Sequence, residues 1–232
     1  RRLLREGRDW KERPARSHFS AWVSQRSAEF IRRRDREKPF FLSMGYFDPH
    51  SPYDNYPRES EGLLREECRP PVVSPLGEEP EHRPKALEEI RRLQCRTPHA
   101  RFSPEETEQL RRGYFAAISF LDSQLALVMD ALREEGIYDD TLIIFSSDHG
   151  DMICDHDLLG KGAYFYEGCT AVPLIVKYPG QREGRVERGP VQLNDIFATA
   201  MYAAGAPEEA PPESIPLQRG PVRDIAVCEY RG

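Results

Sequence analysis

The chain has 232 residues, of which 39% are hydrophobic and 31% charged, so it is one globular domain or part of a larger one. Its formal net charge of −6 argues against nucleic acid as a partner, because contact with phosphate backbones requires a basic face. No run approaches the roughly 20 consecutive apolar residues that a membrane-spanning helix requires, so no membrane span is predicted.

The first predicted helix begins at Ser20, which can cap it, and ends before Pro39. A basic run at 32–38 suits its C-terminus, because positive charge is favourable there. Its inward positions recur at a spacing of three and four: Trp22, Val23, Ser27, Phe30 and Ile31. The short apolar run at 40–44 then predicts a buried strand.

A proline-rich loop follows this strand. His50 lies between Pro49 and Pro52, and prolines restrict both themselves and the residues before them, so we expect His50 on a stiff loop. A lone histidine in a loop is usually a surface or packed imidazole, which leaves its role open at this point. Residues 58–101 are polar, proline-rich and irregular, with a short helix expected at 85–93; long excursions of this kind are often lids or specificity loops.

The strongest helix signal begins at Ser103, which is followed by proline at the first helical position and by Glu106 three residues later. Gly136 is a good terminator. The apolar positions at helical period are Leu110, Tyr114, Ala117, Leu121, Leu125, Val128 and Leu132. The order of strand, excursion, helix and strand predicts a right-handed crossover and a parallel sheet.

The apolar run at 142–145 predicts a central strand buried on both faces. Asp148 and His149 follow its end, where open α/β sheets place ligands, so they are candidate metal ligands. The other interpretation is a tight turn, which Asp and Gly favour. Lys161 is flanked by two glycines, which allow close approach to an anion, although a solvated surface lysine fits the same pattern.

Three further elements are expected toward the C-terminus. Residues 172–176 predict a strand, and 193–204 an amphipathic helix capped by Asn194 or Asp195 and stopped at Gly205. Residues 225–228 begin another strand. The five cysteines show neither CxxC spacing nor disulfide density, which leaves the redox compartment and the localisation open.

Several segments together resemble the sulfatase family of the alkaline-phosphatase superfamily. They are SDHGDM at 147–152, DH at 155–156, LLGKG at 158–162, YFYEG at 164–168 and VPLIV at 172–176. The resemblance implies an α/β fold with a mostly parallel sheet flanked by helices, here incomplete. It makes 1–205 part of a catalytic domain and 206–232 the start of the connection toward a C-terminal subdomain.

The resemblance also implies a sulfuric ester hydrolase acting on a small-molecule or glycan sulfate ester. Asp148 and His149 would be metal ligands, Lys161 a cation on the ester oxygens that helps the leaving group, and His50 a sulfate contact and general acid. His156 would reach the substrate or orient the loop by hydrogen bonds. Calcium is the first expectation for the divalent metal, while manganese and zinc stay open because they accept imidazole nitrogen.

Some of the family pattern is missing or altered. Cys154 and Asp157 stand where the family commonly has glycine. Sulfatases carry a Cys-x-Pro-x-Arg or Ser-x-Pro-x-Arg signature upstream of the Pro-His segment, and its first residue becomes the formylglycine nucleophile. Cys68 has proline at the spacing of this signature but Val72 in place of the arginine, and it lies downstream of His50, so it is not the nucleophile. The formylglycine nucleophile and a pair of metal-binding aspartates are therefore expected upstream of this chain, which by itself should be inactive. A phosphonate or phosphodiester hydrolase, or a catalytically dead binding module, are the alternatives.

Overall fold

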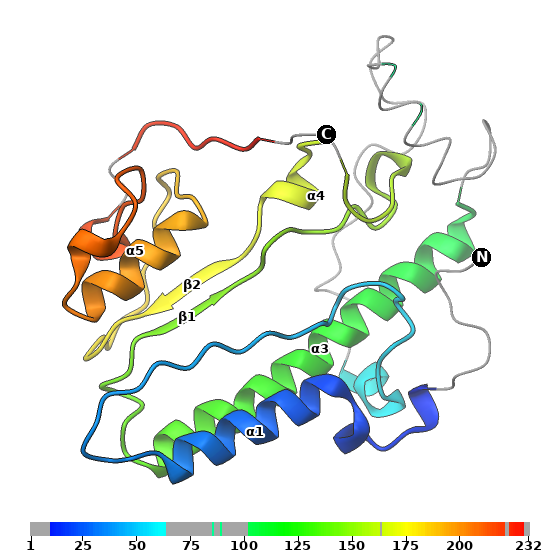
Figure 1. The fold of residues 1–232 in the computed structure, drawn as a ribbon. Coiled ribbons are helices and arrows are strands. Elements are labelled where there is room, and N and C mark those ends of the chain that lie inside the picture. Colours follow the sequence, from blue (N-terminus) through cyan, green and yellow to red (C-terminus); the bar gives the residue numbers. More distant parts are fainter. Residues whose placement is uncertain are drawn as a thin grey trace. The chain divides into compact units, whose positions relative to one another are not determined.

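A computed structural model describes residues 10–63, 85, 89, 102–162, 164–220 and 223–229 (Figure 1). The chain divides into two compact units. Unit 1 comprises Arg1–Tyr138 and Asp151–Tyr164, and unit 2 comprises Asp139–Gly150 and Phe165–Gly232. Apart from Lys85 and Glu89, the helix expected at 85–93 lies outside the described residues, as do Cys68 and Val72.

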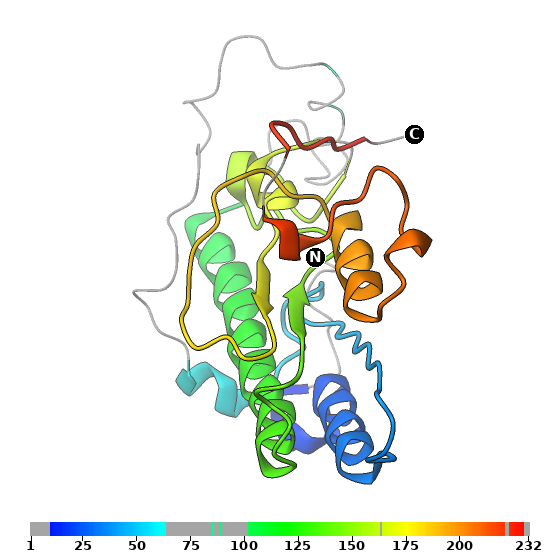
Figure 2. The ribbon, with the colours of Figure 1, turned by 90° about the vertical axis from the view of Figure 1, so that its left-hand side faces the viewer.

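Unit 1 is built on two helices that lie side by side, α1 (Phe19–Arg33) and α3 (Pro104–Glu134), as Figures 1 and 2 both show. Ion pairs join their C-terminal ends, with Arg32 to Glu134 at 2.8 Å and Arg34 to Glu135 at 2.9 Å. The buried face of α1 consists mostly of small side chains: Ser20, Ala21, Val23, Ser24, Ser27, Ala28 and Ile31. Small side chains allow two helices to approach closely.

The sequence prediction for α1 was wrong in two details. Trp22 and Phe30 are 56% and 43% exposed, so the inward face follows the serines and alanines rather than the largest apolar side chains. The N-cap is His18, and Ser20 lies inside the first turn. Its hydroxyl is not a cap but donates a hydrogen bond to Asp48 Oδ2 at 2.5 Å.

The prediction for α3 is confirmed. Ser103 Oγ accepts a hydrogen bond from the Glu106 backbone N–H at 3.1 Å, and the Ser103 N–H donates to Glu106 Oε2 at 2.9 Å, which closes the capping box. Of the expected inward positions, Leu110, Ala117, Leu121, Val128 and Leu132 are buried. Gly136, with a φ of +70°, follows the end of the helix.

Helix α3 has a stretch long and apolar enough, by length and composition, to cross a membrane. The core helix of a globular protein meets the same criterion. Here the helix packs along α1 and buries Phe120 at 2% and Ala131 at 0% exposure, while Ile118 and Leu127 on the same helix are exposed.

Two predicted strands are wrong. Residues 39–47 are extended but form no strand, and Phe41 is 79% exposed. Residues 225–228 likewise form no strand. An extended segment becomes a strand only when a neighbour pairs with its N–H and C=O groups, and an apolar run does not by itself supply that neighbour.

The described strands are β1 (Ile143–Ser146) and β2 (Leu174–Lys177), both in unit 2. They pair antiparallel, with Phe145 opposite Ile175. Both were expected from the sequence, but the burial of β1 on both faces was not borne out, because all four of its residues are half-buried. Since 40–44 is not a strand, the expected parallel crossover into β1 is absent from the described residues.

Unit 2 also contains α5 (Asn194–Ala203), which ends before Gly205 at a φ of +79°, as predicted. Its N-cap is Leu193 rather than Asn194 or Asp195. The buried Asp195 instead accepts hydrogen bonds from the backbone N–H groups of Gln192 and Ile215, each at 2.8 Å. It also pairs with Arg223, so this carboxylate ties the C-terminal tail to α5.

Candidate active site

In unit 1 the fold brings together two predicted site residues that are 111 positions apart: Lys161 Nζ contacts Nε2 of His50. The other ring nitrogen, Nδ1, lies 2.8 Å from the Ser51 carbonyl oxygen. A carbonyl only accepts, so the hydrogen of the neutral ring is on Nδ1 and the Nε2 lone pair accepts from Lys161. A lysine ammonium has more than one N–H group, so the same side chain can also donate to an anion.

The loop that carries His50, here called the His50 loop, comprises residues 48–53. Helix α1 anchors its first residue, Asp48, which is 7% exposed and accepts the hydrogen bond from Ser20. Burial raises the pKa of Asp48, and the Ser20 hydrogen bond opposes this increase. The Phe47 ring lies 4.8 Å from the His50 ring, centroid to centroid. Helix α1 therefore fixes the loop two residues before the imidazole.

The far end of the same loop rests on α3 at Gly113. A Cβ atom on Gly113 would lie 1.8 Å from the Tyr53 carbonyl oxygen, which is far inside van der Waals contact. Only glycine allows the loop backbone to approach the helix this closely. The hydroxyl of Tyr53, which is 2% exposed, donates a hydrogen bond to Asp151 Oδ2 at 3.2 Å, and burial raises the pKa of this hydroxyl.

The loop that carries Lys161 begins at Asp151 and folds back on itself. The Met152 N–H donates to the Gly160 carbonyl at 2.9 Å. Between these residues the backbone is strained, because Ile153, Cys154 and His156 have φ values of 30°, 72° and 54°. Positive φ is unusual outside glycine, and for a β-branched residue it is an outlier that surrounding structure must hold in place.

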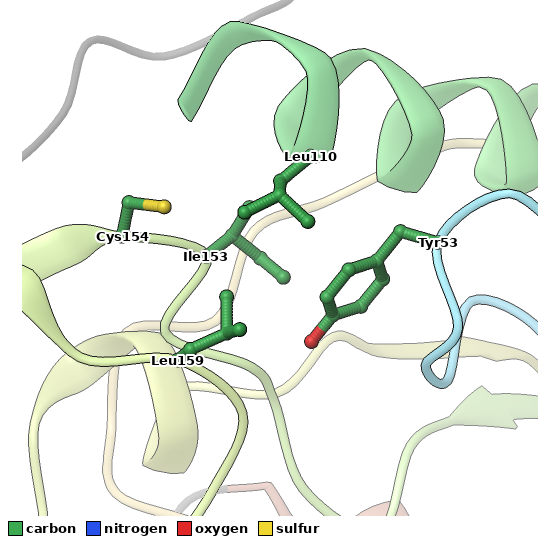
Figure 3. Close-up of a cluster of buried hydrophobic side chains, with 5 residues drawn as sticks. All are labelled: Tyr53, Leu110, Ile153, Cys154 and Leu159. Atoms are coloured by element: carbon green, nitrogen blue, oxygen red, sulfur yellow. The ribbon is translucent and has the colours of Figure 1, made fainter. Parts of the chain in front are cut away.

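A small apolar cluster and one arginine hold this loop. Figure 3 shows the cluster, to which the His50 loop, α3 and the Lys161 loop each contribute: Tyr53, Leu110, Ile153, Cys154 and Leu159. The arginine is Arg111 of α3, which is 6% exposed. Its guanidinium donates to the Ile153 carbonyl at 3.1 Å and lies 3.5 Å from Asp155 Oδ1.

The predicted metal ligands, Asp148 and His149, lie in unit 2 just beyond the end of β1, as expected. His149 Nδ1 donates to the Gly150 carbonyl at 3.0 Å, which leaves Nε2 with its lone pair 3.6 Å from Asp148 Oδ2. Metal-binding histidines characteristically donate their other ring N–H in this way. With metal–ligand bonds of about 2.0–2.6 Å, both atoms can reach one ion, so the pair fits a divalent cation.

The same residues form a tight turn, as the other interpretation of this motif expected, and metal binding by them stays a prediction. Asp148 Oδ1 accepts from the His149 N–H at 3.0 Å, and the Gly150 N–H donates to the Cys169 carbonyl at 2.8 Å. A Cβ on Gly150 would lie 2.0 Å from the Gly168 carbonyl oxygen, so glycine is required here. Within the described ranges, no group of three or more histidine, cysteine or carboxylate side chains is arranged to hold an ion.

The other predicted site residue, His156, is half-buried in the 3-10 turn Asp155–Asp157. Its contact with substrate stays a prediction. Sequence reasoning missed Tyr53, Arg111 and Asp151, which support the loops. The charge of Arg111 gave no sign that it is buried, and Tyr53 and Asp151 are 98 positions apart, so no local pattern connects them.

Comparison with known proteins shows what the chain is similar to. The Sulfatase family model matches residues 8–206. An arylsulfatase of Clostridium perfringens (strain 13 / Type A) is 32% identical over 191 residues, which are 79% of this chain and 38% of that protein. A choline-sulfatase of Rhizobium meliloti (strain 1021) is 33% identical over 189 residues, which are 79% of this chain and 35% of that protein.

Among solved structures, the phosphonate monoester hydrolase SpPMH from Silicibacter pomeroyi has a TM-score of 0.70 at 21% identity, covering 94% of this chain and 44% of that chain. This likeness concerns the fold and agrees with the α/β class expected from the sequence. The chain spans less than half the length of each of these three proteins.

Proposed function

Because the chain belongs to the sulfatase family, we propose that it forms part of a metal-dependent sulfuric ester hydrolase. The observation that carries the proposal is the contact between Lys161 Nζ and His50 Nε2. Sulfuryl transfer spreads negative charge over oxygens, and an ammonium held beside an imidazole is suited to stabilise that charge. We assign residues 1–205 to the catalytic domain, in which β1 and β2 would join a larger, mostly parallel sheet flanked by helices.

The two residues have different tasks in this proposal. The Lys161 ammonium contacts the ester oxygens and lowers the energy of the charge that develops on them. His50 contacts the sulfate group and protonates the leaving oxygen. Its Nε2 carries no hydrogen in the described tautomer, so His50 takes up a proton from solvent before it protonates the leaving oxygen, while Lys161 stays an ammonium. His156 is assigned to substrate binding on the same loop.

Asp148 and His149 would hold a divalent metal, with calcium as first candidate and manganese or zinc as the others. The metal would supply electrophilic stabilisation of a sulfate oxygen. Two ligands are fewer than any of these ions requires, so further ligands and the formylglycine nucleophile are expected on a segment preceding this one. The substrate class is a small-molecule or glycan sulfate ester, and the chain by itself is expected to be inactive.

Hydrolysis of an aryl sulfate by the polypeptide that contains this chain tests the proposal. Lys161→Met should lower kcat/KM by about 10² to 10³, the usual cost of losing one group that stabilises transition-state charge. Lys38→Met is the control, because Lys38 is 75% exposed and pairs only locally with Asp35 in the described contacts. Equal rates for Lys161→Met and Lys38→Met would reject the assignment.

A phosphonate or phosphodiester substrate is the second candidate. The side chains of Asp148 and His149 support this second candidate, because an imidazole nitrogen suits the transition metals on which phosphonate and phosphodiester hydrolases often depend. The same assay with a phosphonate monoester separates the two candidates. A higher kcat/KM for the phosphonate than for the sulfate ester would favour the second.

A further inference from the structure

Helix α3 supports both loops of the His50–Lys161 pair within one turn. Gly113 receives the backbone of the His50 loop at Tyr53, and Arg111 holds the Lys161 loop at Ile153. Leu110 packs in the apolar cluster between them (Figure 3). A single rigid element therefore carries the two loops, neither of which has regular secondary structure at the contacting residue.

The loops are also joined directly by the hydrogen bond between Tyr53 and Asp151. Tyr53 lies three residues after His50. Asp151 begins the segment that the hydrogen bond between Met152 and Gly160 closes just before Lys161. A shift at this buried bond is therefore transmitted over a few residues of constrained backbone to both members of the pair.

Arg111 supplies the second restraint. It donates to the carbonyl of Ile153, the β-branched residue held at a φ of 30°. A buried guanidinium has several N–H groups in a fixed plane, so it can hold a carbonyl in one orientation. Without that donor, the strained turn between Asp151 and Lys161 would lose the contact that compensates for its unfavourable backbone.

From these contacts we infer that Tyr53, Asp151 and Arg111 are positioning residues. They set the distance between His50 and Lys161 and hold the imidazole in the tautomer that accepts from the lysine. They do so through the loops, and no contact of theirs with a substrate is implied. The inference rests on the proposed function only for the catalytic task of His50 and Lys161. The relative position of these two side chains can be measured without enzyme turnover.

The test is the imidazole ¹⁵N spectrum of His50 in the whole chain, which distinguishes a hydrogen on Nδ1 from one on Nε2. The variants are Tyr53→Phe, which removes the hydroxyl, and Asp151→Ala and Asp151→Asn, which remove and keep an acceptor for it. The matched control is Tyr56→Phe. Tyr56 is likewise buried, at 4% exposure, in a cluster with Ala116 and Ala117 of α3, and its hydroxyl donates at 2.9 Å to Oε1 of Glu61, which is not part of the Lys161 loop.

In the wild type and in Asp151→Asn we expect one tautomer, with the hydrogen on Nδ1. In Tyr53→Phe and Asp151→Ala we expect that single pattern to be lost in favour of a mixture. Tyr56→Phe should lower Tm about as much as Tyr53→Phe does while keeping the single pattern. The inference is overturned if Tyr53→Phe keeps the wild-type spectrum, or if Tyr56→Phe changes it as much.

Two further measurements keep the outcomes distinct. If Tyr53→Phe does not fold by circular dichroism, the Asp151→Asn and Asp151→Ala pair decides alone: identical His50 spectra for the two would reject the inference. If the spectra behave as expected but Lys161→Met hydrolyses an aryl sulfate normally, the proposed function fails and the positioning role stands.

Discussion

The two pairs of predicted site residues are built in opposite ways. His50 and Lys161 are 111 positions apart and meet only because buried side chains of unit 1 hold their loops. Asp148 and His149 are neighbours on an exposed turn in unit 2, and the Asp148 side chain is 84% exposed. The first pair therefore depends on the packing of a whole unit, whereas the second depends on a local turn. Substitutions that disrupt one pair should therefore leave the other intact.

The largest effect is expected at Gly113, where the His50 loop touches α3. In Gly113→Ala the new Cβ would overlap the Tyr53 carbonyl oxygen, which is backbone and cannot swing away. We expect the free energy of unfolding to fall by about 3 kcal/mol, the upper range for overpacking. Urea denaturation measures it. Gly184→Ala is the control, since nothing lies within 4 Å of that Cβ. Similar losses of unfolding free energy in both variants would show that the close approach of the Tyr53 carbonyl to Gly113 does not require glycine.

The second prediction compares the buried Arg111 with its exposed neighbour Arg112. Arg111→Met leaves the buried Ile153 carbonyl without this donor, and we expect a loss of about 2 kcal/mol in unfolding free energy. The adjacent Arg112 is 44% exposed, with Glu108 3.9 Å away. Arg112→Met should therefore change stability by less than about 0.5 kcal/mol. If chemical denaturation gives the reverse order, Arg111 does not hold the loop.

These two predictions concern residues that the sequence did not identify, while much else was predictable. The capping box at Ser103, the helix that follows it and the position of Asp148 beyond a short strand are local patterns, and all three were found. His50 and Lys161 were chosen by their resemblance to a family. Their mutual contact, by contrast, is a property of packing between distant segments.

The failures have a common physical cause. The run at 40–44 is as apolar as a buried strand, but strand formation depends on a pairing partner that composition does not reveal. The inward face of α1 is lined by serine and alanine, because a close helix–helix approach selects small side chains rather than apolar ones. Both errors come from treating hydrophobicity as sufficient evidence of burial.

The pH dependence of stability tests the anchoring of the His50 loop at Asp48. Burial raises the pKa of this carboxyl, so the folded state binds its proton more tightly than the unfolded state does. Its contribution to stability should therefore decline as pH rises from the ordinary carboxyl range through the raised pKa. Asp48→Asn should remove this decline and be more stable than the wild type at neutral pH.

Ser20→Ala should do the opposite, because it removes the hydrogen bond that lowers the pKa of Asp48, and so should make the decline steeper. Denaturation at a series of pH values compares the three proteins. Parallel curves for all three would mean that Asp48 does not carry the predicted linkage.

The smallest effect on stability is expected at the exposed pair. Asp148→Asn should change the unfolding free energy by less than about 0.5 kcal/mol, as is usual for surface substitutions. It should nevertheless weaken Mn²⁺ binding, detected as paramagnetic broadening of the His149 signals, because one of the two adjacent ligands loses its negative charge. Asp130→Asn, which removes an exposed carboxylate of α3, is the control. Equal broadening in both variants would argue against a metal at Asp148 and His149.

The central claim is that His50 and Lys161 form a binding site for a tetrahedral oxyanion. Titration of the chain with inorganic sulfate, followed through the NMR signals of the His50 ring and the Lys161 ammonium, tests it most directly. We expect both sets of signals to move together and to saturate, and we expect Lys161→Met to abolish the shift at His50. Sulfate that leaves both residues unchanged, or that shifts His50 equally in Lys161→Met, would contradict the claim.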